Sequence, residues 1–384
     1  MIKWVRLFLF GRLELVSFSN LYLNNFNIKN DTMKNTLKFL TLLLMIGNSS
    51  FGQDISKKID SVVKSYHSKN PDIGISVGFI KDDEEYYTAY GKLNKESQID
   101  INKNSIFEIA SITKILTSNL IAQAAIDKKL KTDDYIDNYL PVSYTLHQNL
   151  KNKIKISDLA SHQSGLPDLD FGKLIELNPQ QPVSSVTEKS LSTIINNCSE
   201  LIDYGKYRYS TIGYTLLGQI LEKVYGKSYD KIIREKILEP LKMTNTLTKD
   251  FNVKNRTMGY NPNGGIQEFF TWNITASAGL VKSNSSDMIK YLKTILTKNN
   301  PISTAEIIAE KIFYKDEKRE MGLGINISTD DKNTIYLKSG DSMGQSSIIC
   351  YNRIKNWGIV ILLNQRNSKM RQDMLNEIYE KILK

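Results

Sequence analysis

Short apolar runs bounded by polar turns occur near the start and near the end of the chain. Runs of this length, rich in β-branched and aromatic residues, are typical of strands. The first two, residues 73–80 and 85–91, flank the polar turn Lys81-Asp82-Asp83-Glu84 and are predicted to form a hairpin. The later predicted strands are residues 321–327, 334–338, 345–351 and 357–363.

Between and beside these strands, apolar residues recur with the spacing of helices. That spacing places them on one face of each helix, where they can be buried against another element. The segment 133–283 contains mostly helices and loops, with long connections around residues 165–183 and 252–272. Outside this segment, helices are predicted over residues 54–69, 115–129, 287–296 and 370–383.

Strands at both chain ends and helices between them predict a mixed α/β fold of the α+β type. We expect one antiparallel sheet that is built from both ends of the chain and flanked by helices. The helical segment, about residues 133–283, is then a subdomain inserted into a domain that spans residues 53–384. An active site is expected between these two lobes.

The first 52 residues have the pattern of a targeting segment. A basic start after Met33, an apolar run over residues 39–46 and a small, polar exit are typical of a secretory signal peptide. We expect a signal peptide over residues 33–52, preceded by an upstream extension over residues 1–32. The alternative for this extension is a longer leader or a membrane-surface segment. The mature protein is expected to be periplasmic or secreted, without stable insertion into a membrane.

Composition narrows the possible functions. The formal net charge is +10, but 51 Lys and Arg residues are interleaved with 41 Asp and Glu residues and form no basic stripe with aromatics. Nucleic-acid binding is therefore not expected. The histidines and cysteines form no cluster with metal-ligand spacing, so no metal or other cofactor is predicted. Cys198 and Cys350 are expected to be small buried side chains, and the sequence does not decide whether they form a disulfide. The protein is expected to be a monomer.

The tetrapeptide Ser111-Ile112-Thr113-Lys114 is the first candidate for catalysis. It opens the predicted helix 115–129, and a serine and a lysine three positions apart lie on one helix face. A lysine that burial keeps neutral can take the proton of a serine hydroxyl and make it a nucleophile. Backbone N–H groups at the helix start can stabilise negative charge that develops on a substrate.

The same spacing occurs twice more, at Ser61–Lys64 and at Ser228–Lys231. A single match is more simply explained by a capping serine and a solvated lysine. The two other matches lie among charged residues, which favours exposed helix faces. Ser111 instead follows the apolar run 106–110 and precedes a helix rich in Leu, Ile and Ala, so its lysine is expected to be buried.

Two further motifs support this choice. Tyr209-Ser210-Thr211 precedes an apolar helix, and Lys338-Ser339-Gly340 ends a predicted strand. In this combination the sequence resembles the serine β-lactamase and penicillin-binding-protein superfamily, which uses Ser-x-x-Lys and Lys-Thr-Gly elements. The Tyr-Ser-Thr motif is similar to the Tyr-x-Asn element of the class C branch. Further segments that resemble this branch are residues 159–167, 239–246, and 278–280 with 287–288.

The resemblance implies acyl transfer through a covalent intermediate on Ser111. Lys114 then accepts or relays the serine proton. Tyr209, expected between cations and partly as a phenolate, is the base for attack and the acid for the leaving group. The backbone N–H groups of Ser111 and Asp341 are expected to form the oxyanion hole.

Substrate binding is expected from Lys338, Ser339, Gly340 and Thr211, with Lys338 attracting a substrate carboxylate. Two positions depart from the family pattern. Thr211 replaces an asparagine whose amide binds substrate and lysine in the family. Its shorter hydroxyl puts efficient β-lactam hydrolysis in doubt and leaves esterase or peptidase activity open. Asp341 brings a carboxylate close to the oxyanion region, where it either faces the site or pairs with Lys338.

His162 allows two interpretations. It can serve a Ser-His-Asp triad, or it can cap a helix over residues 156–161 that Gly165 and Pro167 terminate. The capping interpretation is favoured. The chain also contains no Gly-x-Ser-x-Gly motif of the kind that marks α/β-hydrolases.

Three functions remain open at this point. The first is a secreted serine hydrolase that acts on a peptide, ester or amide, such as a D-alanyl-D-alanine carboxypeptidase. The second is a true class C-like β-lactamase. The third is a catalytically inactive protein that keeps the fold and binds cell-wall peptides. The expected partner in each case is a small molecule or a peptide, and the sequence carries no recognisable code for its identity.

Overall fold

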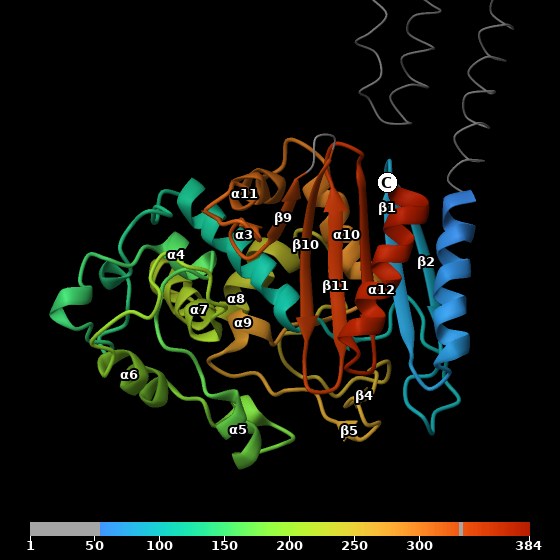
Figure 1. Ribbon diagram of the computed structural model, residues 1–384, viewed down its shortest axis with the longest axis horizontal. Helices are drawn as coiled ribbons and strands as arrows, with labels where there is room; N and C mark the ends of the chain where they lie inside the picture. Colours follow the sequence, from blue (N-terminus) through green and yellow to red (C-terminus); the bar gives the residue numbers. More distant parts are fainter. Residues whose placement is uncertain (1–53, 330–332) are drawn as a thin grey trace, which may run out of the picture. The chain divides into compact units, whose positions relative to one another are not determined.

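The computed structural model describes residues 54–329 and 333–384 (Figure 1). The chain divides into two compact units, Met1–Lys57 and Lys58–Lys384. The predicted upstream extension and signal peptide, residues 1–52, lie outside the described residues. Within the described part of the chain, no helix is both long and apolar enough to cross a membrane.

The second unit is built around an antiparallel sheet of eight strands. The strands are β1 (Ile75–Lys81), β2 (Glu84–Tyr90), β7 (Tyr314–Lys315), β8 (Glu320–Met321), β9 (Asn326–Thr329), β10 (Thr334–Asp341), β11 (Ser346–Asn352) and β12 (Trp357–Leu363). They follow the order β2-β1-β12-β11-β10-β9-β8-β7, so β1 from the start of the unit pairs with β12 from its end. This arrangement confirms the predicted sheet built from both chain ends.

Helices flank the sheet and are the main regular elements of the chain between β2 and β7 (Figure 1). They are α3 (Thr113–Ile126), α4 (Ile156–Ala160), α5 (Phe171–Leu177), α6 (Glu188–Asn196), α7 (Thr211–Tyr225), α8 (Tyr229–Ile233), α9 (Ala276–Gly279), α10 (Ser285–Leu296), α11 (Pro301–Ala309) and α12 (Ser368–Ile378). α10 contacts β1 and β12, and α12 contacts β11 and β12 from the other side of the sheet. β11 and β12 are buried along their whole length because both of their faces are covered.

The prediction of a single strand over residues 321–327 is wrong. These residues belong to β8 and β9, which are joined by a tight turn. Gly324 in this turn has a φ of +75°, and a Cβ on Gly322 would lie 2.3 Å from the carbonyl oxygen of Ala309. The turn is therefore imposed by close backbone contacts, which an apolar pattern does not reveal.

The predicted long connections contain short elements of their own. α5 lies within residues 165–183. Residues 252–272 contain the small hairpin of β4 (Gly259–Tyr260) and β5 (Ile266–Gln267). A further two-stranded pair joins β3 (Phe107–Glu108), just before Ser111, to β6 (Lys282–Ser283). Elements of two residues are too short to show a periodic pattern, so the sequence did not reveal most of them.

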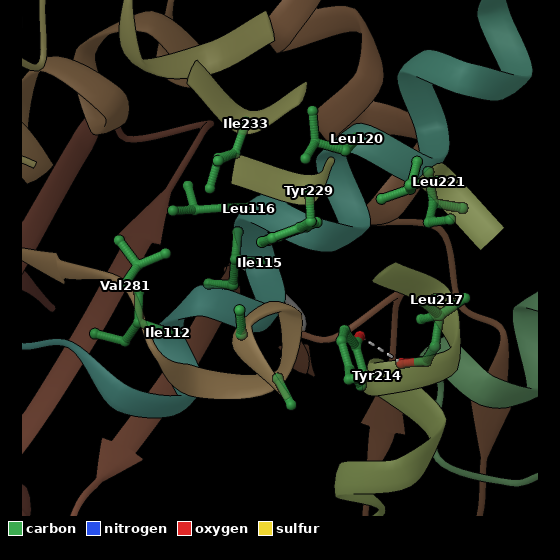
Figure 2. Close-up of a cluster of buried hydrophobic side chains, with 14 of the residues drawn as sticks. Ile112, Ile115, Leu116, Leu120, Tyr214, Leu217, Leu221, Tyr229, Ile233 and Val281 are labelled. Atoms are coloured by element: carbon green, nitrogen blue, oxygen red, sulfur yellow. Dashed lines mark hydrogen bonds between the residues drawn. The ribbon is translucent and has the colours of Figure 1, made fainter. Parts of the chain in front are cut away.

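Helix α3 is buried over almost its whole length, from Thr113 to Ala124. It contacts α7 and α8, and Figure 2 shows the apolar side chains that these helices contribute to the core. These side chains include Ile115, Leu116 and Leu120 of α3, Leu217 and Leu221 of α7, and Tyr229 and Ile233 of α8. Lys114 lies in the first turn of this helix, and its side chain is buried, as the apolar sequence predicts.

The two cysteines do not pair. Cys198, after α6, and Cys350, on β11, are both buried free thiols. Burial raises the pKa of the Cys350 thiol to about 12, so this group remains protonated and unreactive. Both cysteines are thus the small buried side chains that the sequence favours.

The buried carboxyl group of Glu306, on α11, forms hydrogen bonds with residues of α3, α10 and β11. Glu306 accepts hydrogen bonds from the Asn119 amide and from the Tyr291 hydroxyl, each at 2.7 Å. The Tyr351 hydroxyl lies 3.3 Å from Glu306 and donates to Glu310 at 2.6 Å. Burial, together with the neighbouring charge of Glu310, raises the pKa of Glu306.

Glu306→Gln is expected to change how stability depends on pH. The folded-state pKa of Glu306 lies above the ordinary value of 4.5, so the cost of its buried charge is absent at low pH and grows as pH rises. Glutamine keeps the size and the acceptor oxygen without the charge. Relative to the wild type, the variant should gain about 1 kcal/mol or more of unfolding free energy between pH 5 and pH 8. Urea unfolding at both pH values measures this, and a pH-independent difference between the two proteins would contradict it.

Candidate active site

The turn before α3 places Ser111 at the start of that helix. A short 3₁₀ turn over Ala110–Ile112 leads directly into α3. Ala110 has a φ of +44°, in the left-handed region that a residue with a Cβ enters at a cost. Such strain persists where the surroundings enforce it, and it is frequent in segments that present a reactive group.

A phenol and an amine converge on the Ser111 hydroxyl. The Tyr209 hydroxyl lies 2.6 Å from Ser111 Oγ, and Lys114 Nζ lies 3.3 Å from the same oxygen. Lys114 Nζ also donates to the carbonyl oxygen of Ala278 at 2.5 Å. The structure thus brings together the three side chains that the sequence analysis selected as catalytic.

The burial of Lys114 determines its protonation. Its side chain is only 1% exposed, and this burial lowers its pKa to about 7, although the Asp168 carboxylate acts to raise it. A substantial share of the amine is therefore neutral near neutral pH. The neutral amine is the form that accepts a proton.

The N-terminus of α7 holds Tyr209 in place. Ser210, which follows Tyr209, is the N-cap of this helix. The Asp168 carboxylate accepts hydrogen bonds from the backbone N–H groups of Thr211 and Ile212, each at 2.8 Å. A carboxylate at a helix N-terminus is further stabilised by the helix dipole. Together these contacts anchor the residues that follow Tyr209.

Asp168 was not found by sequence reasoning. It directly follows the family-like segment 159–167, and this adjacency is the one signal that would have pointed to it. Its partner Thr211 lies 43 residues further along the chain. An acidic residue in a loop has no periodic pattern that identifies such a distant partner.

Lys338 provides a second cation beside Tyr209. Its side chain is 3% exposed, and its Nζ lies 5.0 Å from the centre of the Tyr209 ring, compared with 4.9 Å for Lys114. Burial lowers the pKa of Lys338 to about 8, against the opposing effect of Tyr209. Within residues 54–329 and 333–384, no carboxylate forms an ion pair with its ammonium.

Strand β10 brings the Lys-Ser-Gly motif against the turn that carries Ser111. β10 pairs with β9 only as far as Leu337, and its last residues contact the turn 110–112. A Cβ on Gly340 would lie 2.4 Å from the carbonyl oxygen of Ile109 and 2.9 Å from the backbone nitrogen of Ser111. Only a residue without a side chain allows this approach, which explains the glycine in the motif.

The Asp341 carboxylate is held by Arg371 of α12. It accepts from Arg371 Nη1 at 2.8 Å and from the Ser346 hydroxyl at 2.5 Å. Arg371 also donates to the carbonyl oxygen of Gly340 at 3.2 Å, so it secures the end of β10 beside Ser111. The pairing of Asp341 with Lys338 that the sequence left open is therefore not formed. Sequence reasoning missed Arg371, which lies 30 residues further along the chain in an amphipathic helix.

Ser339 and Thr211 are two further residues that were predicted to bind substrate. Ser339 lies between Lys338 and Gly340 on β10, and Thr211 is the first residue of α7. Among the described contacts, the Thr211 hydroxyl forms no hydrogen bond with Lys114, whose partners are Ser111 and Ala278. The amide of asparagine is longer and can donate two hydrogen bonds, whereas the threonine hydroxyl at this position donates one.

The two other Ser-x-x-Lys matches have no such surroundings. Ser61 is exposed on a helix that includes residues 58–69. Ser228 caps α8 and accepts from the backbone N–H of Lys231 at 3.4 Å. These are the capping and exposed roles that the charged surroundings of both motifs predict.

Two sequence comparisons relate the chain to known proteins. The family model described as Beta-lactamase matches residues 59–382. Protein flp of Staphylococcus aureus (strain N315) is 26% identical over 326 residues, which cover 81% of this chain and 63% of flp. The chain thus spans less than two thirds of the length of this relative.

Solved structures show the same fold. A class C beta-lactamase has a TM-score of 0.75 at 21% identity, and the match covers 86% of this chain and 96% of that one. A beta-lactamase/D-alanine carboxypeptidase from Pseudomonas syringae has a TM-score of 0.75 at 17% identity, with 85% and 99% covered. Since the family model extends over most of the sequence and the fold agrees with it, the chain belongs to the beta-lactamase family.

Proposed function

We propose that this protein is a serine hydrolase that forms an acyl-enzyme on Ser111. The observation that supports this most is the position of the Ser111 hydroxyl, 2.6 Å from the Tyr209 hydroxyl and 3.3 Å from the buried amine of Lys114. A serine hydroxyl is a weak nucleophile unless a neighbouring base takes its proton. Membership of the beta-lactamase family supports the same class of chemistry.

The reaction begins when the Ser111 oxygen bonds the substrate carbonyl carbon and its proton passes to the pair formed by Lys114 and Tyr209. Charge then develops on the carbonyl oxygen, and the backbone N–H groups of Ser111 and Asp341 stabilise it. The pair returns the proton to the leaving group as the bond to that group breaks. Water then attacks the acyl-enzyme in the same way and frees Ser111.

The proposed substrate class rests on the charge of Lys338 and on the side chain of Thr211. Lys338 is a buried ammonium that suits a substrate with a carboxylate close to the scissile bond. Thr211, in place of a longer amide, favours a peptide, ester or simple amide over a β-lactam as the hydrolysed substrate. We therefore place D-alanyl-D-alanine carboxypeptidase or esterase activity first. A solved structure with the same fold bears the name beta-lactamase/D-alanine carboxypeptidase, so carboxypeptidase activity is a candidate beside β-lactam hydrolysis.

A true β-lactamase is the second candidate, because class C beta-lactamases share the fold. Turnover of a chromogenic cephalosporin distinguishes it from the first. Rapid turnover would favour the β-lactamase, whereas a fluorescent penicillin that stays bound to Ser111 would favour a penicillin-binding carboxypeptidase. Hydrolysis of a p-nitrophenyl ester with slow cephalosporin turnover would favour the esterase.

Intact-mass spectrometry after a broad acylating probe tests the proposal as a whole. The wild-type protein should gain the mass of one acyl group, and the Ser111→Ala protein should gain none. If folded wild-type protein reacts with neither an ester, a penicillin nor a cephalosporin, the proposal fails. A catalytically inactive protein that binds cell-wall peptides would then be the better description.

We also propose that the mature protein is periplasmic or secreted and monomeric. The basic, apolar and small-residue order of residues 33–52 supports export. N-terminal sequencing of protein from the producing cell should give Gln53 as the first residue, and light scattering should give the mass of one chain. Cytoplasmic protein that retains residues 33–52 would contradict export.

The pH dependence of acylation should separate the two lysines. With the pKa of Lys114 lowered to about 7, kcat/KM for a neutral ester should rise about tenfold per pH unit below pH 7 and then level off. The pKa of Lys338 is about 8, so its charge is lost above that pH, and kcat/KM for an ester that bears a carboxylate should fall again. Initial rates measure both profiles. Identical profiles for the two esters would argue against a substrate-binding role for Lys338.

A further inference from the structure

His162 lies beside Tyr209 and has no part in the reaction described above. It is completely buried, and the centre of its ring lies 4.5 Å from that of Tyr209, with 35° between the ring planes. The rings of Tyr214 and Tyr207 lie 5.2 Å and 5.8 Å from it. The imidazole is therefore enclosed by three tyrosines, one of which reaches the Ser111 hydroxyl.

The backbone of His162 occupies a position where glycine is common. At the end of α4, the N–H of Gln163 bonds the carbonyl oxygen of Asp158 at 2.9 Å, and the N–H of His162 bonds that of Leu159 at 3.4 Å. His162 has a φ of +63°, in the left-handed region of this helix-ending motif. The predicted capping position is thus confirmed. His162 adopts this conformation although it carries a Cβ, which the left-handed region accommodates at a cost.

The two ring nitrogens of His162 have different surroundings. Nδ1 accepts a hydrogen bond from the backbone N–H of Ser210 at 3.2 Å, which places the proton of the neutral ring on Nε2. Nε2 is buried without a hydrogen-bond partner in the described part of the chain, so the Ser-His-Asp triad is not formed. Burial and the charges of Lys338 and Lys114 lower the pKa of His162 well below its usual value, so the ring remains neutral.

We propose that His162 is a positioning residue for Tyr209, an inference that rests on the proposed hydrolase function. Its Nδ1 holds Ser210, and its ring supports the neighbouring phenol ring. Together these contacts keep the Tyr209 hydroxyl 2.6 Å from Ser111 Oγ. A neutral aromatic ring supplies this support without adding a third positive charge beside the two lysines.

A double-variant cycle with a p-nitrophenyl ester tests this role. His162→Asn is chosen because asparagine tolerates the left-handed backbone and retains an acceptor for Ser210, while the aromatic ring is lost. With Tyr209 intact, kcat should fall about 10- to 100-fold and KM should change less than about twofold, because the buried ring does not touch substrate. In a Tyr209→Phe background the same change should alter kcat less than about threefold, because the positioned hydroxyl is absent.

His67→Asn is the matched control. His67 also bonds a backbone group, the carbonyl oxygen of Ile73 at 3.0 Å, and stacks on Tyr90 with 5.6 Å between ring centres. The His67→Asn substitution should leave kcat and KM unchanged, both with Tyr209 intact and in the Tyr209→Phe background. Should His162→Asn fail to fold, His162→Phe, which keeps a ring and loses the acceptor, enters the same cycle.

The outcomes separate this inference from the function on which it rests. An equal loss of kcat with and without the Tyr209 hydroxyl would overturn the positioning role and leave a general packing defect. Unchanged kcat in the His162 variants would overturn it as well. Failure of the proposed hydrolase function would instead appear as folded wild-type protein that does not turn over the ester, whereas a measurable wild-type rate that Tyr209→Phe leaves unaltered would overturn the positioning role by itself.

Discussion

Ser111→Ala is expected to abolish acylation and to lower ester turnover by at least about 1,000-fold. The substitution removes the oxygen that bonds the substrate, while Lys114 and Tyr209 remain with no atom to activate. The side chain lies at the start of α3 and contributes little to the apolar core, so the fold should be retained. Intact mass after an acylating probe, together with initial rates, measures the loss.

Ser61→Ala is the control that the chain itself offers. Ser61 begins another Ser-x-x-Lys match but is exposed on a helix, so its replacement should leave acylation and turnover unchanged. Stoichiometric acylation of Ser111→Ala would identify another nucleophile and end the proposed mechanism. Equal losses in both variants would point to a cause unrelated to the site.

Gly340→Ala is expected to lower kcat/KM by at least about 100-fold while most of the protein remains folded. Its Cβ would lie 2.4 Å from the carbonyl oxygen of Ile109, 2.6 Å from Ser347 Oγ and 2.9 Å from the backbone nitrogen of Ser111. β10 must then move away from the turn that carries Ser111. That movement displaces Lys338 and the backbone N–H group of Asp341 from the substrate. Steady-state kinetics with an ester measures the effect.

Gly172→Ala is the matched control for an added methyl group. Gly172 lies in α5, and its Cβ would come no closer than 3.4 Å, to the Asp170 carboxylate. Activity should be unchanged, and the helix should gain about 0.5–1 kcal/mol because alanine is the better helix former. Full activity of Gly340→Ala would show that the close approach of β10 is not required for catalysis.

The proposed nucleophile and its amine were predictable because they are neighbours in the sequence at the start of a helix. Ser111 and Lys114 are three positions apart, and the apolar residues after them predict the burial that lowers the pKa of the lysine. The ordered motifs also indicated the beta-lactamase family, which the family model over residues 59–382 confirms. Both signals are contained in short stretches of sequence and need no knowledge of distant contacts.

The residues that contact the backbone beside the proposed catalytic groups were not predictable in the same way. Asp168 accepts a hydrogen bond from Thr211, which lies 43 residues away in the sequence. Arg371 donates one to Asp341, which lies 30 residues away. For His162 the sequence predicted the capping position but not the hydrogen bond with Ser210, which lies 48 residues away. Each is a single polar residue in a loop or on a helix face, where no periodic pattern identifies its partner.

The order of apolar and polar residues by itself determined the main strands and the buried helix that follows Ser111, and the short motifs indicated the family. These depend on interactions between residues close in sequence and on the gain from removing apolar surface from water. Only the tertiary structure decided which groups meet. Tyr209 and Gly340 reach Ser111 from α7 and β10, and the carboxylate of Asp341 turns to Arg371. Such contacts are set by how the helices pack on the sheet. Hydrogen bonds at these distances require the relative positions of distant segments to be fixed precisely, and the sequence of one segment does not fix them.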